Sequence, residues 1–479
     1  MNNIIIQNIN LGGISDSIVQ GQENSVAECV GFNLHGEPGI LKSNQKLAKE
    51  SGAYVDDLVK VILPCSDGIT YLFGSTNGKI WSRTSAGVYA LEATASPAAG
   101  AVGILDAYEY QGYIYYAMES RLGRVAVGSP TAWAGRNDSW ATFTNTDADF
   151  HPMKEQNQVL YIGDGNYVAQ VDAGVFTADA LDIKTPLRIK SLGKILTDLL
   201  VGTFVNVYRV ATEIFRWNTW SVSFSSSDTI PEVGINSFLV TDNYNLVNAG
   251  RKGNIYYYNG VQLEQFKKIP GNWLGTNEAL IHPNASCNMN GLPLFGLSNI
   301  LGNPATQGVY SLGGYDRNYP KVLNLEWLIS TGNSSAIDIG AIELVGTVLL
   351  VSWKDATVPA AIVYGVDKLD LTAKIVSAYF ATRVINISRN DSKTLAGYVA
   401  YRSLPNDSSI KIYHKVNYAI AWTEATTVVD IIRKTVYLKE AFPEANTIQI
   451  KVESNAAVGD ESQYINNAPE IEMCEFSFE

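Results

Sequence analysis

The chain has 479 residues, a formal net charge of −12, 46% hydrophobic residues and only 17% charged residues. This acidic balance argues against a surface that grips nucleic acid through clustered lysines and arginines, although DNA could still pass nearby without specific binding. The 26 tyrosines and 40 glycines are typical of extensive β-structure with many turns rather than of a helical enzyme.

Metal sites, export and membrane insertion are not expected. Cys29, Cys65, Cys287 and Cys474 are far apart and form no CxxC or Cys/His cluster, so we predict no zinc site, no other metal and no cofactor. Met1–Asn10 lacks the basic start and the long apolar run of a secretory signal. No stretch reaches about 18 apolar residues, the length of a membrane span. Synthesis in a reducing cytoplasm is therefore expected.

Residues 1–50 are predicted to form an N-terminal arm that precedes the rest of the fold. Asn3–Ile9 alternates isoleucine with polar residues and is predicted to be a strand without an obvious partner in the repeats that follow. Phe32–Leu34 and Ile40–Lys42 flank a segment with Gly36, Pro38 and Gly39, which predicts a β-hairpin.

Seven short apolar strand signatures recur over residues 51–372, each opening just after a Gly, Asn or Asp. Their anchors lie at 68, 112, 157, 198, 243, 291 and 346, with steps of 44, 45, 41, 45, 48 and 55 residues. A second apolar pair follows most anchors after about ten to seventeen residues, which gives each repeat two strands, as a meander requires. A β-rich period of this length is typical of a β-propeller with one blade per repeat. We predict seven blades; six blades, or an irregular all-β protein, are the alternatives.

Helical periodicity is rare in the sequence. Gln45–Val59 is one candidate helix, and the region of Lys194 is a weaker one. From residue 373 the repeat ends, and the pattern becomes strands in which apolar and polar residues alternate, such as Ile410–Val416 and Thr447–Val452, separated by turns. Six or so strands in residues 373–479 predict a C-terminal β-sandwich-like domain. The expected fold class is therefore all-β throughout.

No motif for catalysis stands out. The four histidines, His35, His151, His282 and His414, are scattered and accompany no Gly-x-Ser-x-Gly elbow, so structural or solvated roles are expected for them. Ser75–Trp81 echoes a sialidase-type turn only once and is better explained as an Asn-Gly hairpin. No catalytic residue is predicted.

Turn aspartates and aromatic runs leave other functions open. Carboxylate pairs for glycoside hydrolysis are not excluded by the sequence. Four aspartates near turns of the third repeat could hold calcium, but solvated turn residues are the simpler interpretation; they are Asp147, Asp149, Asp164 and Asp172. The aromatic segments Tyr108–Tyr116, Tyr256–Tyr258 and Trp217 with Trp220 could stack on sugars, but packing between blades explains most of them.

Segments at both ends of the chain form a further pattern. The opening segments are Asn10–Ile14, then Glu28–Asn33 followed by Gly39–Lys42. The closing segments are Tyr398–Tyr401, a Leu-Pro turn, Ser409–Tyr413 and Ala468–Ile471. Together they resemble tailed-bacteriophage tail proteins of the β-propeller hub, nozzle and ring kind, although the family's usual Arg-x-Gly after the opening turn is replaced here by Ser43-Asn44.

The resemblance implies a non-enzymatic virion structural protein, synthesised in the host cytoplasm and located in the tail or at the attachment of the tail to the head. Its partners would be other copies of itself in a ring and other tail or connector proteins. The alternatives are a receptor- or carbohydrate-binding propeller of the tail tip and a glycosidase or lyase propeller. Apolar residues of the terminal strands are the predicted assembly interface: Ile4, Ile6, Ile9, Phe32, Ile412 and Phe476.

Overall fold

Antiparallel β-strands form almost all of the regular structure in the computed structural model, which confirms the all-β prediction. The described residues are 2–17, 19, 24–52, 54–96, 103–145, 149–205, 211–241, 244–271, 278–298, 307–313, 320–332, 336–387, 393–429, 435–442, 445–456 and 468–478. Their helical elements are α1 (Ile9–Gly12) and the 3-10 helix η1 (Trp133–Gly135). No helix in this part of the chain is long and apolar enough to cross a membrane.

The chain divides into two compact units. We call residues 49–307 and 331–368 the propeller unit, and residues 1–48, 308–330 and 369–479 the terminal unit. The predicted domain limits at 50 and 372 lie close to these, but residues 308–330 fall in the terminal unit. The reason is a pairing within that unit: β29 (Leu323–Trp327) lies parallel to β2 (Glu28–Val30), with Val30 opposite Leu325.

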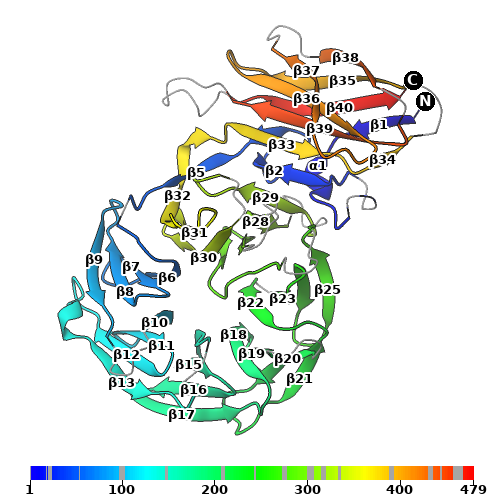
Figure 1. Cartoon of the computed structure of the whole chain (residues 1–479). Helices are drawn as coiled ribbons and strands as arrows, with labels where there is room; N and C mark the ends of the chain where they lie inside the picture. Colours follow the sequence, from blue (N-terminus) through cyan, green and yellow to red (C-terminus); the bar gives the residue numbers. More distant parts are fainter. Residues whose placement is uncertain are drawn as a thin grey trace. The chain divides into compact units, whose positions relative to one another are not determined.

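The propeller unit consists of consecutive antiparallel meanders, and Figure 1 shows them arranged radially in chain order. Such radial repetition of sheets is the β-propeller fold. The first two sheets contain β6 (Val59–Pro64), β7 (Thr70–Gly74), β8 (Lys79–Arg83), β9 (Tyr89–Thr94), β10 (Ile104–Tyr110), β11 (Tyr113–Met118), β12 (Arg121–Ala126) and β13 (Asn137–Thr142). The next two contain β14 (Met153–Gln156), β15 (Val159–Asp164), β16 (Tyr167–Asp172), β17 (Val175–Asp182), β18 (Arg188–Ile195), β19 (Asp198–Phe204), β20 (Thr212–Trp217) and β21 (Ser226–Ile230). The remaining strands are β22 (Ile235–Val240), β23 (Asn245–Ala249), β24 (Asn254–Tyr258), β25 (Leu263–Lys268), β26 (Ser286–Met289), β27 (Leu292–Leu297), β30 (Ile337–Val345), β31 (Val348–Asp355) and β32 (Val363–Lys374).

Apolar side chains hold neighbouring sheets together. Trp133, for example, packs in one cluster with Tyr71 of the first sheet and Tyr116 of the second. The first and last sheets also share a cluster, in which Leu72 and Trp81 pack with Leu350. This contact closes the ring of sheets, because Leu72 and Leu350, almost 280 residues apart in sequence, lie in the same core.

The anchors of the sequence repeat lie where the first strand of a sheet turns into the second. These tight turns place residues in the left-handed region, which glycine and asparagine adopt most readily. The backbone φ angle is +82° at Gly68, +77° at Gly112, +52° at Asn157, +85° at Gly291 and +62° at Gly346. The anchor at 243 lies outside the described residues. The repeat therefore reflects a backbone requirement of the hairpin, not a shared chemical motif.

Both predicted helices are wrong. Gln45–Val59 contains β5 (Gln45–Lys49), turns, and the start of β6, and Lys194 lies in β18. Short apolar runs do not by themselves distinguish a strand from a helix.

The terminal unit contains two sheets. One has the order β3-β4-β40-β35-β38, with β1 also paired to β40, and the other includes β28-β29-β2-β33-β39-β36-β37, with β34 paired to β39. The first sheet is built from β1 (Asn2–Ile6), β3 (Phe32–Asn33), β4 (Leu41–Ser43), β35 (Lys393–Ser403), β38 (Thr435–Phe442) and β40 (Glu470–Phe478). The second is built from β2, β28 (Gly308–Leu312), β29, β33 (Ser377–Ala381), β34 (Ile385–Asn386), β36 (Ser409–Val416), β37 (Thr423–Val428) and β39 (Thr447–Asn455). His414 of β36 lies against Phe442 of β38, so side chains of the two sheets meet.

The two ends of the chain pair with each other. β1 runs antiparallel to β40, with Ile4 opposite Phe476 and Ile6 opposite Cys474. The predicted hairpin is confirmed, because β3 pairs with β4 through Phe32 and Ser43. The N-terminal strand therefore has a partner within its own chain.

Candidate functional site

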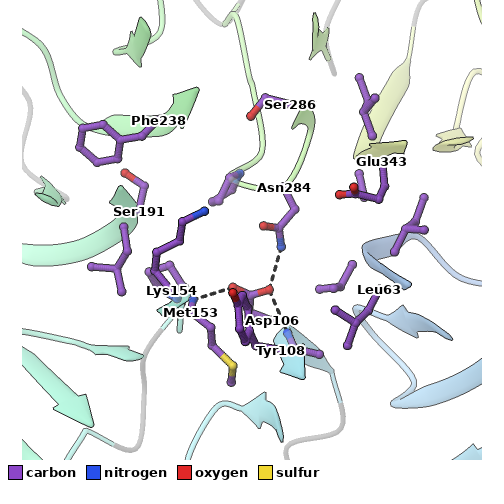
Figure 2. Close-up of a pocket in the computed structure, with 18 of the residues that line it drawn as sticks. Leu63, Asp106, Tyr108, Met153, Lys154, Ser191, Phe238, Asn284, Ser286 and Glu343 are labelled. Atoms are coloured by element: carbon purple, nitrogen blue, oxygen red, sulfur yellow. Dashed lines mark hydrogen bonds between the residues drawn. The ribbon is translucent and has the colours of Figure 1, made fainter. Parts of the chain in front are cut away.

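A cavity of about 410 Å³ lies at the centre of the propeller unit, and we call it the central cavity. The first strand of every consecutive sheet contributes to its wall, and Figure 2 shows Asp106, Lys154 and Glu343 among the residues around this space. Representatives from successive strands are Leu63 of β6, Asp106 of β10, Lys154 of β14, Ser191 of β18, Phe238 of β22, Ser286 of β26 and Glu343 of β30. A volume of several hundred Å³ with a few converging polar groups is typical of a small-molecule site.

The first strands share a β-bulge close to the cavity. The register with the second strand slips by one residue at equivalent points of β6, β10, β18, β22 and β30, where Lys60, Leu105, Lys190, Asn236 and Gly340 are the extra residues. A bulge redirects the side chain of the extra residue. Three of these residues, Lys60, Leu105 and Lys190, line a smaller hollow next to the central cavity. The sequence repeat thus has a structural counterpart that sequence periodicity did not show.

Asp106 connects three parts of the cavity wall. Its carboxylate accepts hydrogen bonds from the backbone N–H of Met153 at 2.7 Å, from the backbone N–H of Ala107 at 2.9 Å and from Nδ2 of Asn284 at 2.9 Å. Burial raises its pKa to about 6, although the three donors oppose that rise. With its oxygens engaged in this way, Asp106 acts as a structural bridge.

The segment before β26 crosses between strands on different sides of the cavity. Asn284 Nδ2 also donates to the Lys60 carbonyl oxygen at 3.2 Å, and the Asn284 carbonyl accepts from the N–H of Ile342 at 2.9 Å. Two residues earlier, His282 Nε2 lies 2.7 Å from Asp338 Oδ1. Burial would raise the pKa of Asp338, but His282, Ser298 and Lys60 together outweigh that effect and lower it. This segment separates the central cavity from the smaller hollow, since Pro283 and Asn284 line both.

Lys154 and Glu343 are the charged groups that remain available. Figure 2 shows them reaching into the central cavity from different strands, β14 and β30. The ammonium group of Lys154 has no hydrogen bond or ion pair to any residue in the described ranges. Burial and the nearby Lys194 lower its pKa, and Asp106 and Glu343 partly oppose that shift. Burial raises the pKa of Glu343 to about 7, and its carboxylate accepts only the backbone N–H of Leu344 among described groups. Protein partners therefore balance the charge and the hydrogen-bonding capacity of Lys154 and Glu343 only in part.

The raised pKa of Glu343 predicts that stability falls as pH rises. Above its ordinary value of 4.5 the unfolded state releases the proton, whereas the folded state keeps it up to about 7. The folded state thus binds more protons in this window, so unfolding becomes easier as pH rises through it, by about 1–3 kcal/mol for this group. Urea unfolding midpoints from pH 4.5 to 8 should show a flatter profile for Glu343→Gln than for the wild type. Parallel profiles would contradict this assignment.

Most predicted interface residues are buried inside the chain. Ile9 is 2% exposed, Ile412 is 1% exposed, and Phe32 and Phe476 are fully buried in the terminal unit. Ile6 is partly buried, and the side chain of Ile4 is outside the described set. These residues build the core of the terminal unit, because the strands that carry them pair with one another.

The histidines have structural surroundings, as expected from the sequence. His151 places its two ring nitrogens 2.7 Å and 3.0 Å from the carbonyl oxygens of Gly163 and Glu119. His414 is buried between strands of the terminal unit. Among the turn aspartates, Asp164 accepts the backbone N–H groups of Thr144 and Asn145. Asp147 lies outside the described residues, and the described ranges contain no group of three or more His, Cys, Asp or Glu side chains suited to a metal ion.

The aromatic segments divide between core and surface. Trp217 is 2% exposed, whereas Trp220 is 80% exposed on the loop between β20 and β21. In β24, Tyr258 is fully buried while Tyr257 on the opposite face is only partly buried. Alternate placement on a strand explains the two tyrosines of β24, as predicted, whereas Trp220 is exposed because it lies on a loop. The wall of the central cavity includes Tyr108 and Phe238 but no other aromatic ring.

A second polar centre, missed in the sequence, lies in the terminal unit. Glu326 of β29 is 1% exposed and accepts hydrogen bonds from Asn44 Nδ2 at 2.6 Å, Ser311 Oγ at 2.6 Å and Asn324 Nδ2 at 2.8 Å. His35 Nε2 lies 3.0 Å from both Glu326 Oε1 and Ser311 Oγ. Ser and Glu contact the same ring nitrogen, whereas a catalytic triad uses the two nitrogens separately. The cluster instead joins the N-terminal hairpin to β28 and β29.

Comparisons with known proteins identify only distant likenesses. No family model and no curated protein matches the chain. Among solved structures, the extracellular domain of a hybrid two-component system from B. thetaiotaomicron matches with 14% identity and a TM-score of 0.45, covering 82% of this chain and 47% of that one. A streptogramin B lyase matches with 12% identity and a TM-score of 0.44, covering 68% and 97%. The β-propeller domain of Cps50 (Swd1) from Myceliophteria thermophila matches with 10% identity and a TM-score of 0.45, covering 66% and 97%. The chain thus spans about half the length of the first of these, and likenesses at this level assign no activity.

Proposed function

We propose that the protein is a non-enzymatic structural component of a tailed-bacteriophage tail, assembled as a symmetric ring with other tail or connector proteins as neighbours. The observation that carries the proposal is the meeting of the phage-like segments in one folded unit. Leu41 and Lys42 of the opening turn pair with Ile471 and Glu470 of the closing segment. Segments more than 400 residues apart thus build one sheet, as expected if they form a single docking module.

The propeller unit would serve this module as a rigid seven-bladed disc. Support for seven comes from the seven first strands that line one central cavity and from the core shared by the first and last sheets. The cavity is crossed by Asn284 and holds only about 410 Å³, so any path for DNA would follow the axis of the assembled ring. This part of the proposal needs no specific contact between the protein and nucleic acid.

The edge strand β38 is the surface we assign to ring assembly. Among the described strands it pairs only with β35, so its other edge presents free backbone hydrogen-bonding groups. Its side chain Tyr437 is 83% exposed, and Val429 shortly before the strand is 65% exposed. A second copy of the chain could extend this sheet, because strand addition combines backbone pairing with burial of such side chains.

Replacing Tyr437 by lysine tests this surface. An aromatic anchor at the centre of an interface contributes enough that its loss should weaken association by about tenfold or more. Light scattering coupled to size exclusion would compare the wild type, Tyr437→Lys and the control Tyr54→Lys, which changes a tyrosine that is 65% exposed in the propeller unit. Dissociation of Tyr437→Lys alone supports the assignment. An unchanged oligomer in all three proteins would exclude β38 as the assembly edge.

A glycosidase is the second candidate, because carboxylates do converge on the central cavity. Asp106 and Glu343 both line it, and burial raises the pKa of each. Glycoside hydrolysis needs two carboxyl groups free to reach the scissile bond. Asp106 already accepts three hydrogen bonds, so Glu343 is the carboxyl group that is freer to reach a substrate. Because hydrolysis needs two such groups, this arrangement favours binding over hydrolysis. Sugar release from a polysaccharide that is abolished by Glu343→Gln would instead support the enzyme.

A further inference from the structure

We infer that the central cavity is a binding site for a small sugar acid, a monosaccharide-sized molecule that carries one carboxylate and several hydroxyl groups. The inference does not depend on the structural role proposed above, since the cavity lies wholly within the propeller unit. It stands on the chemistry of the wall, the size of the space and the charge that the protein leaves without a partner.

Lys154 specifies the charge of the ligand. Its ammonium group points into the cavity and has neither a hydrogen bond nor an ion pair to any residue in the described ranges (Figure 2). A cation held in a partly desolvated site is stabilised by an anion that bonds to it directly. Two carboxyl groups of the wall act on Lys154, but neither is a full partner: Asp106 is held by Met153, Ala107 and Asn284, and burial keeps Glu343 partly protonated near neutral pH. A carboxylate on a ligand would supply the missing partner.

The rest of the wall specifies hydroxyl groups. Ser286 carries a hydroxyl at the cavity, and Glu343 carries a carboxyl group that has no side-chain partner among the described residues. Burial keeps Glu343 partly protonated near neutral pH, so it can donate or accept a hydrogen bond. A sugar hydroxyl matches such a group because it also donates and accepts. A carboxylate or phosphate without hydroxyl groups would bind Lys154 but would make no matching hydrogen bond with Ser286 or Glu343.

The space and its access also fit a monosaccharide. The cavity holds about 410 Å³, within the usual range for small ligands. Its wall reaches Pro64, the last residue of β6, and Glu109, the residue before the last of β10. Glu109 meets the partly exposed turn at Ser66, so the cavity extends to the turns at that end of the sheets. Leu63, Met153 and Phe238 also line the cavity, while their side chains pack mainly into the apolar clusters between neighbouring sheets.

The test is calorimetric titration of the full-length protein with glucuronate, galacturonate and N-acetylneuraminate, and with glucose and inorganic phosphate as comparisons. We expect at least one sugar acid to bind, with glucose and phosphate weaker. Lys154→Met should weaken that binding about tenfold or more, because it removes a charged hydrogen bond. Lys252→Met, at an exposed lysine of the same unit, should leave binding unchanged.

Further variants keep the test decisive. Lys154→Arg should restore part of the affinity lost in Lys154→Met, and Ser286→Ala should weaken binding several-fold without removing a charge. If Lys154→Met does not fold, as judged by its thermal unfolding, Ser286→Ala and Lys154→Arg decide the question. Failure of all three acids to bind the wild type at millimolar concentration would overturn the inference. Binding that Lys154→Met leaves unchanged, or phosphate bound as tightly as the sugar acids, would overturn it as well.

Discussion

Replacing Glu326 by alanine should destabilise the terminal unit more than any other single change considered for this protein. The carboxylate is buried and joins Asn44, Ser311 and Asn324, with His35 also in contact. Removing the acceptor leaves buried donors without a partner, and breaking such a buried charged network costs about 3–5 kcal/mol. The loss of stability should first affect the N-terminal hairpin, β28 and β29, because these donors connect them.

Hydrogen exchange read by mass spectrometry would show this locality. In Glu326→Ala, peptides covering residues 28–44 and 308–313 should lose protection, whereas peptides of β10 and β14 in the propeller unit should keep theirs. Glu472→Ala is the matched control, since Glu472 is an exposed glutamate of β40 in the same unit. Equal exchange in wild type and Glu326→Ala would mean that the network contributes little to the stability of the hairpin.

Replacing Asp106 by alanine should have the second-largest effect, this time on the propeller unit. Three donors from different parts of the wall lose their acceptor: the N–H groups of Met153 and Ala107, and Nδ2 of Asn284. Each buried donor left unsatisfied costs about 1–3 kcal/mol, and the cost of burying the carboxylate is removed, so a net loss of about 3 kcal/mol is expected. Asp106→Asn should lose less, because its amide oxygen can still accept from two donors.

Chemical unfolding with tryptophan fluorescence would measure this loss. The control is Asp179→Ala, which removes an exposed aspartate from the outer strand β17. The order of stability should be wild type and Asp179→Ala first, then Asp106→Asn, then Asp106→Ala. If Asp106→Ala is as stable as the wild type, the hydrogen bonds at the cavity wall do not hold the sheets in place.

The repeat in the sequence predicted the hairpins well because a backbone constraint produced it. Gly68 and Gly346 occupy turn positions with positive φ, where glycine avoids a steric penalty, so the pattern persists without conservation of chemistry. The prediction that the repeated segments form strands succeeded for the same reason. The domain limits were predicted less completely, because the pairing of Val30 with Leu325 joins residues almost 300 apart and leaves no local pattern.

The candidate site could not be derived from local sequence. Asp106, Lys154 and Glu343 lie on different strands, and only the closure of the sheets into a propeller within one chain brings them to one cavity. A weak signal existed, since each is a charged residue within a first strand. The predicted interface residues Phe32 and Phe476 are apolar and lie in terminal strands, but they are buried within the chain, and the sequence did not show that these strands bury each other.

Ring assembly is the central claim, and electron microscopy of the purified full-length protein tests it most directly. At concentrations of tens of micromolar, class averages should show closed rings with one rotational symmetry axis, and each subunit should contain a disc of radial sheets. The Tyr437→Lys protein should show separate subunits under the same conditions. Wild-type protein that remains monomeric over this range, without symmetric particles, would contradict the account.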